Sequence, residues 1–89
     1  MNQTALLSRG NAIVEHIGDE AAIIDLSTHR VSSLNPAGAA LWDHLSEPRT
    51  IAQCADLLAT TFAIDRDRAL SDVRAFASNL LARGLLVHA

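Results

Sequence analysis

The stretch IIDLSTHRVSSLNPAGAALWDHL, residues 23–45, contains the change of hydrophobic pattern that determines the predicted fold. Before Asn35, short β-branched runs alternate with turn residues, which is typical of strands. After Asn35, apolar residues recur every three or four positions, which is typical of amphipathic helices. The sequence therefore predicts an α+β fold in which a sheet comes first and helices follow.

The part of the chain before Asn35 predicts a three-stranded sheet. Residues 18–20 (GDE) and 27–29 (STH) are turn sequences, so the runs between them are short strands. Because both connections are short, the strands should form an antiparallel meander. The predicted strands are residues 11–17, 21–26 and 30–34, and residues 6–9 are expected to add an extended lead-in.

The part of the chain after Asn35 predicts three helices. Asn35 is a suitable N-cap and Pro36 suits the first helical position, so a helix begins here and ends before Pro48. Thr50 and Gln53 have the spacing of a capping box, which predicts the start of a second helix. The apolar stripe of this second helix consists of Ile51, Cys54, Ala55, Leu58 and Phe62.

Asp65 is the expected N-cap of the last and longest predicted helix, residues 66–83. Gly84 stands where a left-handed C-terminal cap belongs, and residues 85–87 are expected to pack back as an extended tail. The predicted fold class is thus α+β, with a three-stranded antiparallel sheet followed by three helices, similar to a winged helix-turn-helix. Residues 1–89 are expected to form a single domain.

The composition disfavours several classes of function. The net charge is −3, all seven basic residues are Arg, and ten acidic residues outnumber them, so a nucleic-acid partner is not expected. No apolar run approaches the length of a membrane span. Residues 1–10 contain no recognisable signal peptide, so we expect a cytoplasmic protein without a membrane partner.

Residues with catalytic or metal-binding chemistry do not form a recognisable constellation. The four histidines lack metal-ligand spacing, and Cys54 lies on an apolar helix stripe, where a buried thiol acts as a small hydrophobic residue. No nucleophile has a base at a characteristic spacing. Trp42 is expected in the core, because a large aromatic side chain fills much of a core built from Leu and Ala. The sequence predicts no catalytic residue, no metal and no cofactor, and therefore not an enzyme.

Three motifs in fixed order resemble the PqqD-like family. They are IIDLST at residues 23–28, LNPAG at residues 34–38 and LWDHL at residues 41–45. The resemblance continues through RTI at residues 49–51 and through the last predicted helix to GLL at residues 84–86. This family includes the elements that recognise the leader segment of ribosomally made, modified peptides. A separate protein of this length is most similar to the recognition partner in lasso-peptide biosynthesis.

The resemblance implies a binding mode and a set of binding residues. The leader of a precursor peptide would add as an extra strand beside residues 30–34, in a groove walled by the last helix. The chain would then present the leader to a separate cysteine-type leader peptidase. The expected leader-binding residues are Arg30, Val31, Ser32, Ser33, Leu34, Val73, Phe76, Ala77, Leu80 and Leu81.

An edge strand is physically suited to this role, because its unpaired N–H and C=O groups can pair with an extended peptide. Side chains alternate along a strand, so Val31 and Ser33 should project to one face, and Ser32 and Leu34 to the other.

Other functions remain open at the level of the sequence. One is a PqqD-type chaperone in quinone-cofactor biosynthesis. Another is a winged-helix module that binds nucleic acid. A third is a dimerisation module, in which the exposed strand pairs with its own copy in a strand-swapped homodimer.

Overall fold

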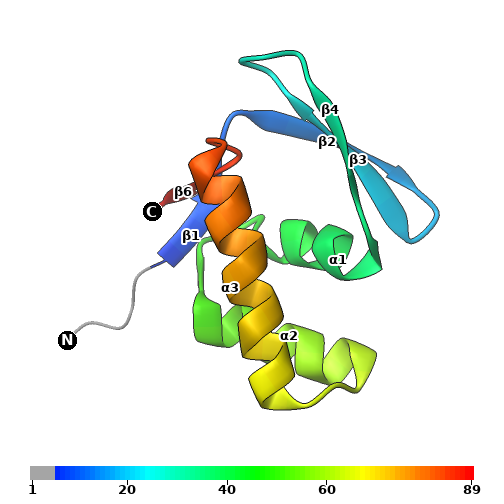
Figure 1. Cartoon of the computed structure of the whole chain (residues 1–89), viewed down its shortest axis with the longest axis vertical. Helices are drawn as coiled ribbons and strands as arrows, with labels where there is room; N and C mark the ends of the chain where they lie inside the picture. The colour runs from blue at the N-terminus through cyan, green and yellow to red at the C-terminus, as the bar shows by residue number, and fades with distance from the viewer. Residues whose placement is uncertain (1–5) are drawn as a thin grey trace.

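The computed structural model describes residues 6–89, which form two small sheets and three helices (Figure 1). Residues 1–5, part of the segment searched for a signal peptide, lie outside the described residues. In chain order the elements are β1 (Leu6–Arg9), β2 (Ala12–Ile17), β3 (Glu20–Asp25), β4 (Val31–Leu34), α1 (Pro36–His44), β5 (Arg49–Thr50), α2 (Ile51–Phe62), α3 (Arg66–Ala82) and β6 (Leu86–His88).

The sheet β2-β3-β4 is the meander that the sequence predicts. Both pairings are antiparallel, with Ala12 opposite Asp25 and Ala21 opposite Leu34. The predicted strand ends differ from the observed ones by one residue at most. Gly18 closes the β2–β3 turn with a φ of +64°, a conformation that glycine adopts without strain.

A second sheet, with strand order β5-β1-β6, was not predicted. The expectation of one sheet was therefore wrong, although an extended lead-in and an extended tail were expected at the positions of β1 and β6. Leu7 of β1 lies opposite Arg49 on one side and His88 on the other. A Cβ at Gly10 would collide with the carbonyl oxygen of Gly84, so glycine permits the close approach of the two ends of this sheet.

The helices begin at the residues that the sequence predicts. The first, α1, ends at His44, before Pro48 as expected, and α3 ends at Ala82, one residue before the predicted end. Asn35 caps α1, and Thr50 and Gln53 form the capping box of α2 with hydrogen bonds of 3.0 and 2.9 Å. Asp65 caps α3, and Gly84 follows that helix with a φ of +72°. Each cap satisfies backbone groups that the helix itself leaves unpaired.

The core lies between the first sheet and the three helices, and it confirms most of the predicted burial. Trp42 and Cys54 are buried, at 2% and 1% exposure. Phe62 is the exception, because 37% of it is exposed. It is the last residue of α2 and lies at the rim of a surface hollow lined by α1. No described helix is both long and apolar enough to cross a bilayer.

Candidate functional site

Strand β4 has one free edge, and its register shows which backbone groups point to it. The Asp25 N–H donates to the Arg30 carbonyl at 2.9 Å, which fixes the alternation of bonds between β3 and β4. Ser32 and Leu34 therefore direct their backbone groups toward β3. Val31 and Ser33 direct theirs away from the sheet, so two N–H and two C=O groups are available to an added strand.

The side chains of β4 alternate as the sequence predicts. Val31 and Ser33 are exposed on the outer face of the sheet, with Val31 at 65% exposure. Leu34 is buried against the core, and Ser32 is half-buried on the same side. A strand added at this edge would therefore have one face toward solvent and the other toward the helices.

The β3–β4 turn is held by the carboxylate of Asp25, which is 6% exposed. Its Oδ1 atom accepts hydrogen bonds from the backbone N–H groups of Ser27 (2.8 Å) and Thr28 (3.3 Å). His29 completes the turn with a φ of +61°. The Ser27 N–H lowers the pKa of Asp25, burial opposes this by raising it, and Thr28 and Arg83 lower it further. The turn fixes where β4 begins.

The lowered pKa of Asp25 predicts a loss of stability in acid. A carboxylate with a lower pKa in the folded state stabilises the fold above its unfolded pKa, near 3.8, and this contribution disappears as the pH falls through the folded value. We expect Asp25→Asn to be less stable at pH 7 and to lose less stability than the parent below about pH 4. Urea unfolding between pH 3 and 7 measures both effects. Asp19→Asn, in an exposed turn, is the control. If the free energy of unfolding of Asp25→Asn and of the parent changed in parallel with pH, the Asp25 carboxylate would not be the group that stabilises the fold.

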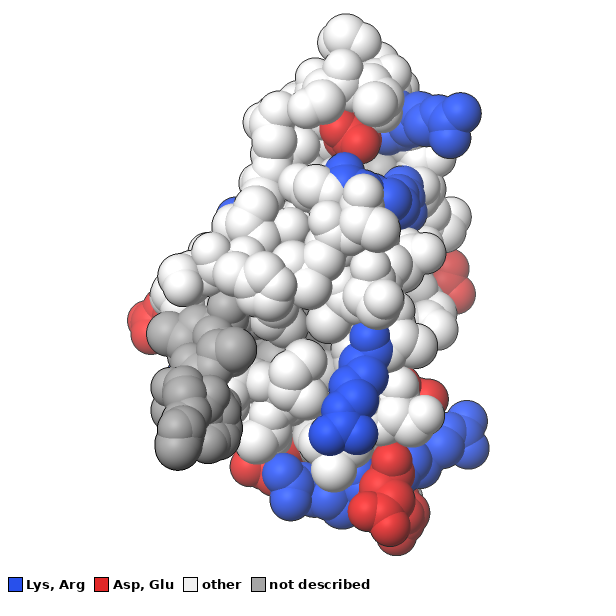
Figure 2. Space-filling view, turned by 60° about the vertical axis from the view of Figure 1, so that its left-hand side comes forward, with Lys and Arg blue, Asp and Glu red and all other residues white. Residues whose placement is uncertain are grey.

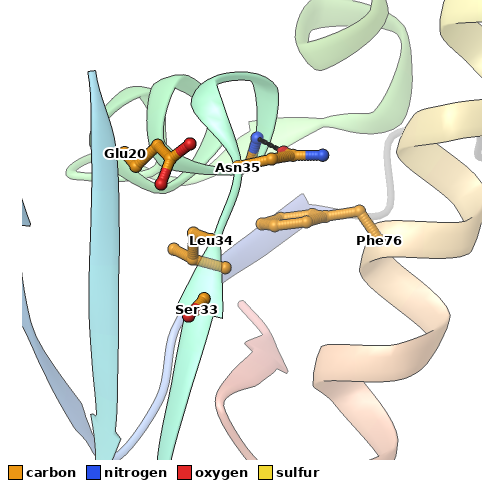
Figure 3. Close-up of a pocket in the computed structure, with 6 residues that line it drawn as sticks. Glu20, Ser33, Leu34, Asn35 and Phe76 are labelled. Carbon is orange, nitrogen blue, oxygen red and sulfur yellow. Dashed lines mark hydrogen bonds between the residues drawn. The ribbon is translucent and has the colours of Figure 1, made fainter.

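A hollow of about 450 Å³ lies beside the end of β4. Figure 3 shows the ring of Phe76 extending from α3 toward Leu34 and Asn35. The ring is half-buried, so one part packs on the domain and another remains accessible. The lining residues are Glu20, Ser33, Leu34, Asn35, Gly38 and Phe76.

Gly38 lies in the first turn of α1, close to the end of β4. The Gly38 N–H donates to Asn35 Oδ1 at 2.8 Å, which places the first turn of α1 directly at the end of β4. A Cβ at Gly38 would lie 3.3 Å from Asn35 Oδ1 and 3.5 Å from the Leu34 Cβ atom. The approach to Asn35 Oδ1 is tight, whereas the distance to Leu34 is an ordinary contact, so glycine at this position mainly spares the capping side chain.

A second hollow, of about 320 Å³, adjoins the first. The two share Asn35, Gly38 and Phe76, and the second continues along α1 and α3 to Arg68 and Asp72. Phe76 thus stands at the junction of the two hollows. Its position suits an aromatic side chain that contacts a bound peptide on both sides.

The other α3 residues expected to bind the leader are placed differently. Val73, Ala77 and Leu80 are 1%, 3% and 3% exposed and belong to the core. Leu81 is half-buried and lies roughly 140° around the helix from Phe76. The structure therefore brings Phe76 to the hollow at the end of β4. The other four residues support α3 from within or lie on another flank of it.

Arg83 forms a contact that the sequence pattern did not reveal. Its Nη2 atom donates to Ser32 Oγ at 2.6 Å, and this bond joins the end of α3 to β4. The two residues are separated by 51 positions, so no local pattern could indicate the contact. Glu20, Asn35 and Gly38 were likewise not expected in the lining. We define the β4 groove as the free edge of β4 together with Phe76, Arg83 and the adjoining hollow.

Two further reactive side chains, Cys54 and His44, have pKa values that are shifted by burial. Burial raises the pKa of the Cys54 thiol to about 11, which leaves it protonated near neutral pH. Burial, and to a smaller extent the charge of Arg49, lower the pKa of His44. Within residues 6–89, no three His, Cys, Asp or Glu side chains gather in a geometry that could hold a metal ion.

Comparisons with known proteins agree with this architecture. The family model described as coenzyme PQQ synthesis protein D (PqqD) matches residues 20–86. The structure of TbiB1 in complex with the TbiA(beta) leader peptide is 25% identical in sequence, with a TM-score of 0.80, and the match covers 89% of this chain and 93% of that one. A lasso peptide synthetase B1 complexed with the leader peptide is 19% identical and shows the same fold, with a TM-score of 0.73 and coverage of 97% and 99%. No curated protein sequence matches the chain significantly.

Proposed function

The chain belongs to the PqqD family, and we propose from this premise that it binds the leader segment of a ribosomally made precursor peptide by strand addition at β4. The observation that carries the proposal is the free edge of β4 beside the accessible ring of Phe76. The edge can pair with the main chain of a peptide whatever its sequence, and the hollow can select one of its side chains. The complex of TbiB1 with a leader peptide supports this assignment.

The proposed mode defines the site as the edge groups of Val31 and Ser33, together with Phe76 and Leu34. Arg30 directly precedes this set, and Ser32 lies between Val31 and Ser33 with its side chain bound to Arg83. Val73, Ala77, Leu80 and Leu81 contribute indirectly, by holding α3 at its distance from the sheet.

A direct binding experiment tests this function. A candidate precursor peptide would be synthesised as separate leader and core segments, each carrying a fluorescent label. We expect the anisotropy of the leader to rise on titration with the chain and that of the core to remain unchanged. Equal binding of both segments would refute leader recognition.

Within the family, two precursor classes compete. The family model is described by coenzyme PQQ synthesis, whereas TbiB1 and the synthetase B1 structure contain leader peptides, the latter of a lasso peptide system. The similarity to TbiB1, which is complexed with the TbiA(beta) leader peptide, covers 89% of the chain and favours leader capture over the chaperone role in quinone-cofactor biosynthesis. A competition experiment decides between the two classes of precursor: a lasso leader and the quinone-cofactor precursor peptide would compete for binding to the chain.

We further propose that the chain acts in the cytoplasm, is not itself an enzyme, and presents the bound leader to a separate cysteine-type peptidase. Its family membership and its similarity to a leader-binding protein support a non-catalytic role. Holding the leader raises the effective concentration of the scissile region at the peptidase without new chemistry.

This role predicts a specific kinetic effect on the peptidase. The chain should lower the apparent KM for the precursor and leave the rate at saturation nearly unchanged, because tethering matters only when precursor is scarce. Cleavage assays across precursor concentrations, with and without the chain, measure this effect. An increase confined to kcat, or cleavage of the precursor by the chain alone, would contradict the proposal.

The β4 edge also permits pairing with a second copy of the chain, as in a strand-swapped homodimer. Because the leader and a second copy would occupy the same backbone groups, they should compete. Sedimentation with and without leader distinguishes leader binding from dimerisation at this edge. A dimer that the leader does not dissociate would contradict leader binding at β4. A winged-helix role on nucleic acid receives no support from the net charge of −3.

A further inference from the structure

The arginines of the chain fall into two groups according to their ion pairs. Four have a carboxylate oxygen within 4.0 Å: Arg9 with Asp43, Arg49 with Glu47, Arg66 with Asp56 and Arg68 with Asp72. The other three, Arg30, Arg74 and Arg83, have no such partner among residues 6–89. Arg83 nevertheless lies close enough to Asp25 for its charge to lower the pKa of that carboxyl group.

Two of the three unpaired arginines lie at the start of β4. Arg30 directly precedes Val31, and Arg83 reaches β4 through its bond to Ser32. Both side chains are exposed. Figure 2 shows basic side chains, with an acidic side chain beside them, near the upper end of this face, at the height where the β3–β4 turn and the end of α3 lie in Figure 1.

Arg83 also faces the same flank of α3 as Phe76. The two residues are seven positions apart, which is about two helical turns and about 10 Å along the axis. Arg74 lies on the opposite flank, roughly 160° around the helix from Phe76. Arg83 can therefore contact a peptide that also contacts Phe76, and Arg74 cannot.

The charge of Arg83 is not neutralised by the nearby Asp25. That carboxylate accepts the N–H groups of Ser27 and Thr28, and it forms no ion pair with Arg83 within 4.0 Å. The guanidinium has five donors, of which Ser32 takes one at 2.6 Å and Asn79 another at 3.5 Å. Donors remain for an incoming carboxylate.

The opposite end of β4 has the reverse charge. Glu20 lines the hollow beside Leu34 and Asn35 and has no ion-pair partner among the described residues. The β4 groove is thus basic at Arg30 and Arg83 and acidic at Glu20. A bound strand would experience this difference along its length.

We propose, on the premise of leader binding at β4, that Arg83 with Arg30 recognises a carboxylate side chain of the leader. The leader is thereby defined chemically as a segment with an apolar side chain at Phe76 and an Asp or Glu toward Arg83. Because both side chains face α3, they lie an even number of residues apart, two or four, at about 3.3 Å per residue. The charge difference along β4 also fixes the direction in which the strand binds.

Selection from a random library of 15-residue peptides, displayed on their mRNA, tests this proposal without knowledge of the leader. On the parent chain we expect enrichment of an Asp or Glu two or four positions from an apolar residue. On Arg83→Gln the apolar preference should persist and the acidic one should disappear. Arg74→Gln removes an equally unpaired charge from the other flank and should retain both preferences. Ser32→Ala removes the hydrogen bond but not the charge, and should also retain the acidic preference.

A selected peptide then supplies a direct measurement. Replacing its Asp by Asn should weaken binding about fivefold on the parent chain and have no effect on Arg83→Gln. An Asp→Lys peptide should bind Arg83→Glu better than the original peptide does, which a merely structural role of Arg83 would not produce.

The outcomes distinguish the recognition of a carboxylate by Arg83 from the underlying proposal that β4 binds a leader. Apolar enrichment without an acidic preference, or an acidic preference that survives Arg83→Gln, overturns this inference and leaves leader binding in place. A parent chain that enriches no peptide overturns leader binding itself.

Discussion

Ser33→Pro should reduce leader affinity about 30-fold while the domain remains folded. Proline removes the Ser33 N–H, which points to the free edge of β4, and leaves a carbonyl of the leader without its partner. Such a loss costs about 2 kcal/mol in a buried interface. The bonds between β3 and β4 are not affected, because Ser32 and Leu34 make them. Proline is tolerated at positions of this kind on edge strands.

The register of β4 provides the controls for this prediction. Ser33→Ala keeps the N–H and should lose far less affinity than Ser33→Pro. Ser32→Pro removes a donor that faces Ile23, so it should lower the free energy of unfolding instead. Anisotropy titration and urea unfolding of the three variants distinguish these effects. If Ser33→Pro binds leader as well as the parent does, strand addition at β4 is wrong.

Phe76→Ala should also weaken leader binding about 30-fold, with only a modest loss of stability. The ring is half-buried at the junction of two hollows, so much of it is available to a peptide. Aromatic side chains in such positions commonly contribute 2 kcal/mol or more to a peptide interface, which corresponds to about this factor.

Leu70→Ala is the matched control for Phe76→Ala. Leu70 is a half-buried apolar residue of the same helix that packs against the core outside the β4 groove. It should lower stability by a similar amount and leave leader affinity unchanged. Equal losses of affinity in the two variants would show that α3 acts only through the fold. Substitutions at Val73 or Ala77 are less informative, because both are buried and their replacement would unfold the domain.

Local signals in the sequence predicted most of the fold. Asn35, Thr50 and Asp65 each offer a side chain that caps the next helix, and the structure uses all three. The second sheet was not predictable in the same way. Its strands are two to four residues long, and Arg49 and Thr50 pair with β1 more than 40 positions away. No periodicity can be read from two residues, and long-range pairing leaves no local pattern.

The candidate site was predictable in part. Strand β4 and Phe76 follow from the order of the motifs, but the division of α3 into core and groove residues does not. Val73, Phe76, Ala77 and Leu80 all belong to one apolar stripe, and only the position of β4 separates Phe76 from the rest. In the sequence, Arg83 is one of seven arginines that are spread along the chain, and nothing local distinguishes it from the others. Its bond to Ser32 depends on the packing of α3 against the sheet.

The most direct measurement of the central claim is amide hydrogen exchange, followed by NMR, with and without leader peptide. The sheet has a second free edge at β2, where the Leu26 N–H bond to the Asn11 carbonyl (3.1 Å) shows that the backbone N–H groups of Val14 and His16 point outward. Binding at β4 should slow the exchange of the Val31 and Ser33 amides and leave the Val14 and His16 amides unchanged. Protection of the β2 amides, or of neither edge, would contradict leader binding by strand addition at β4.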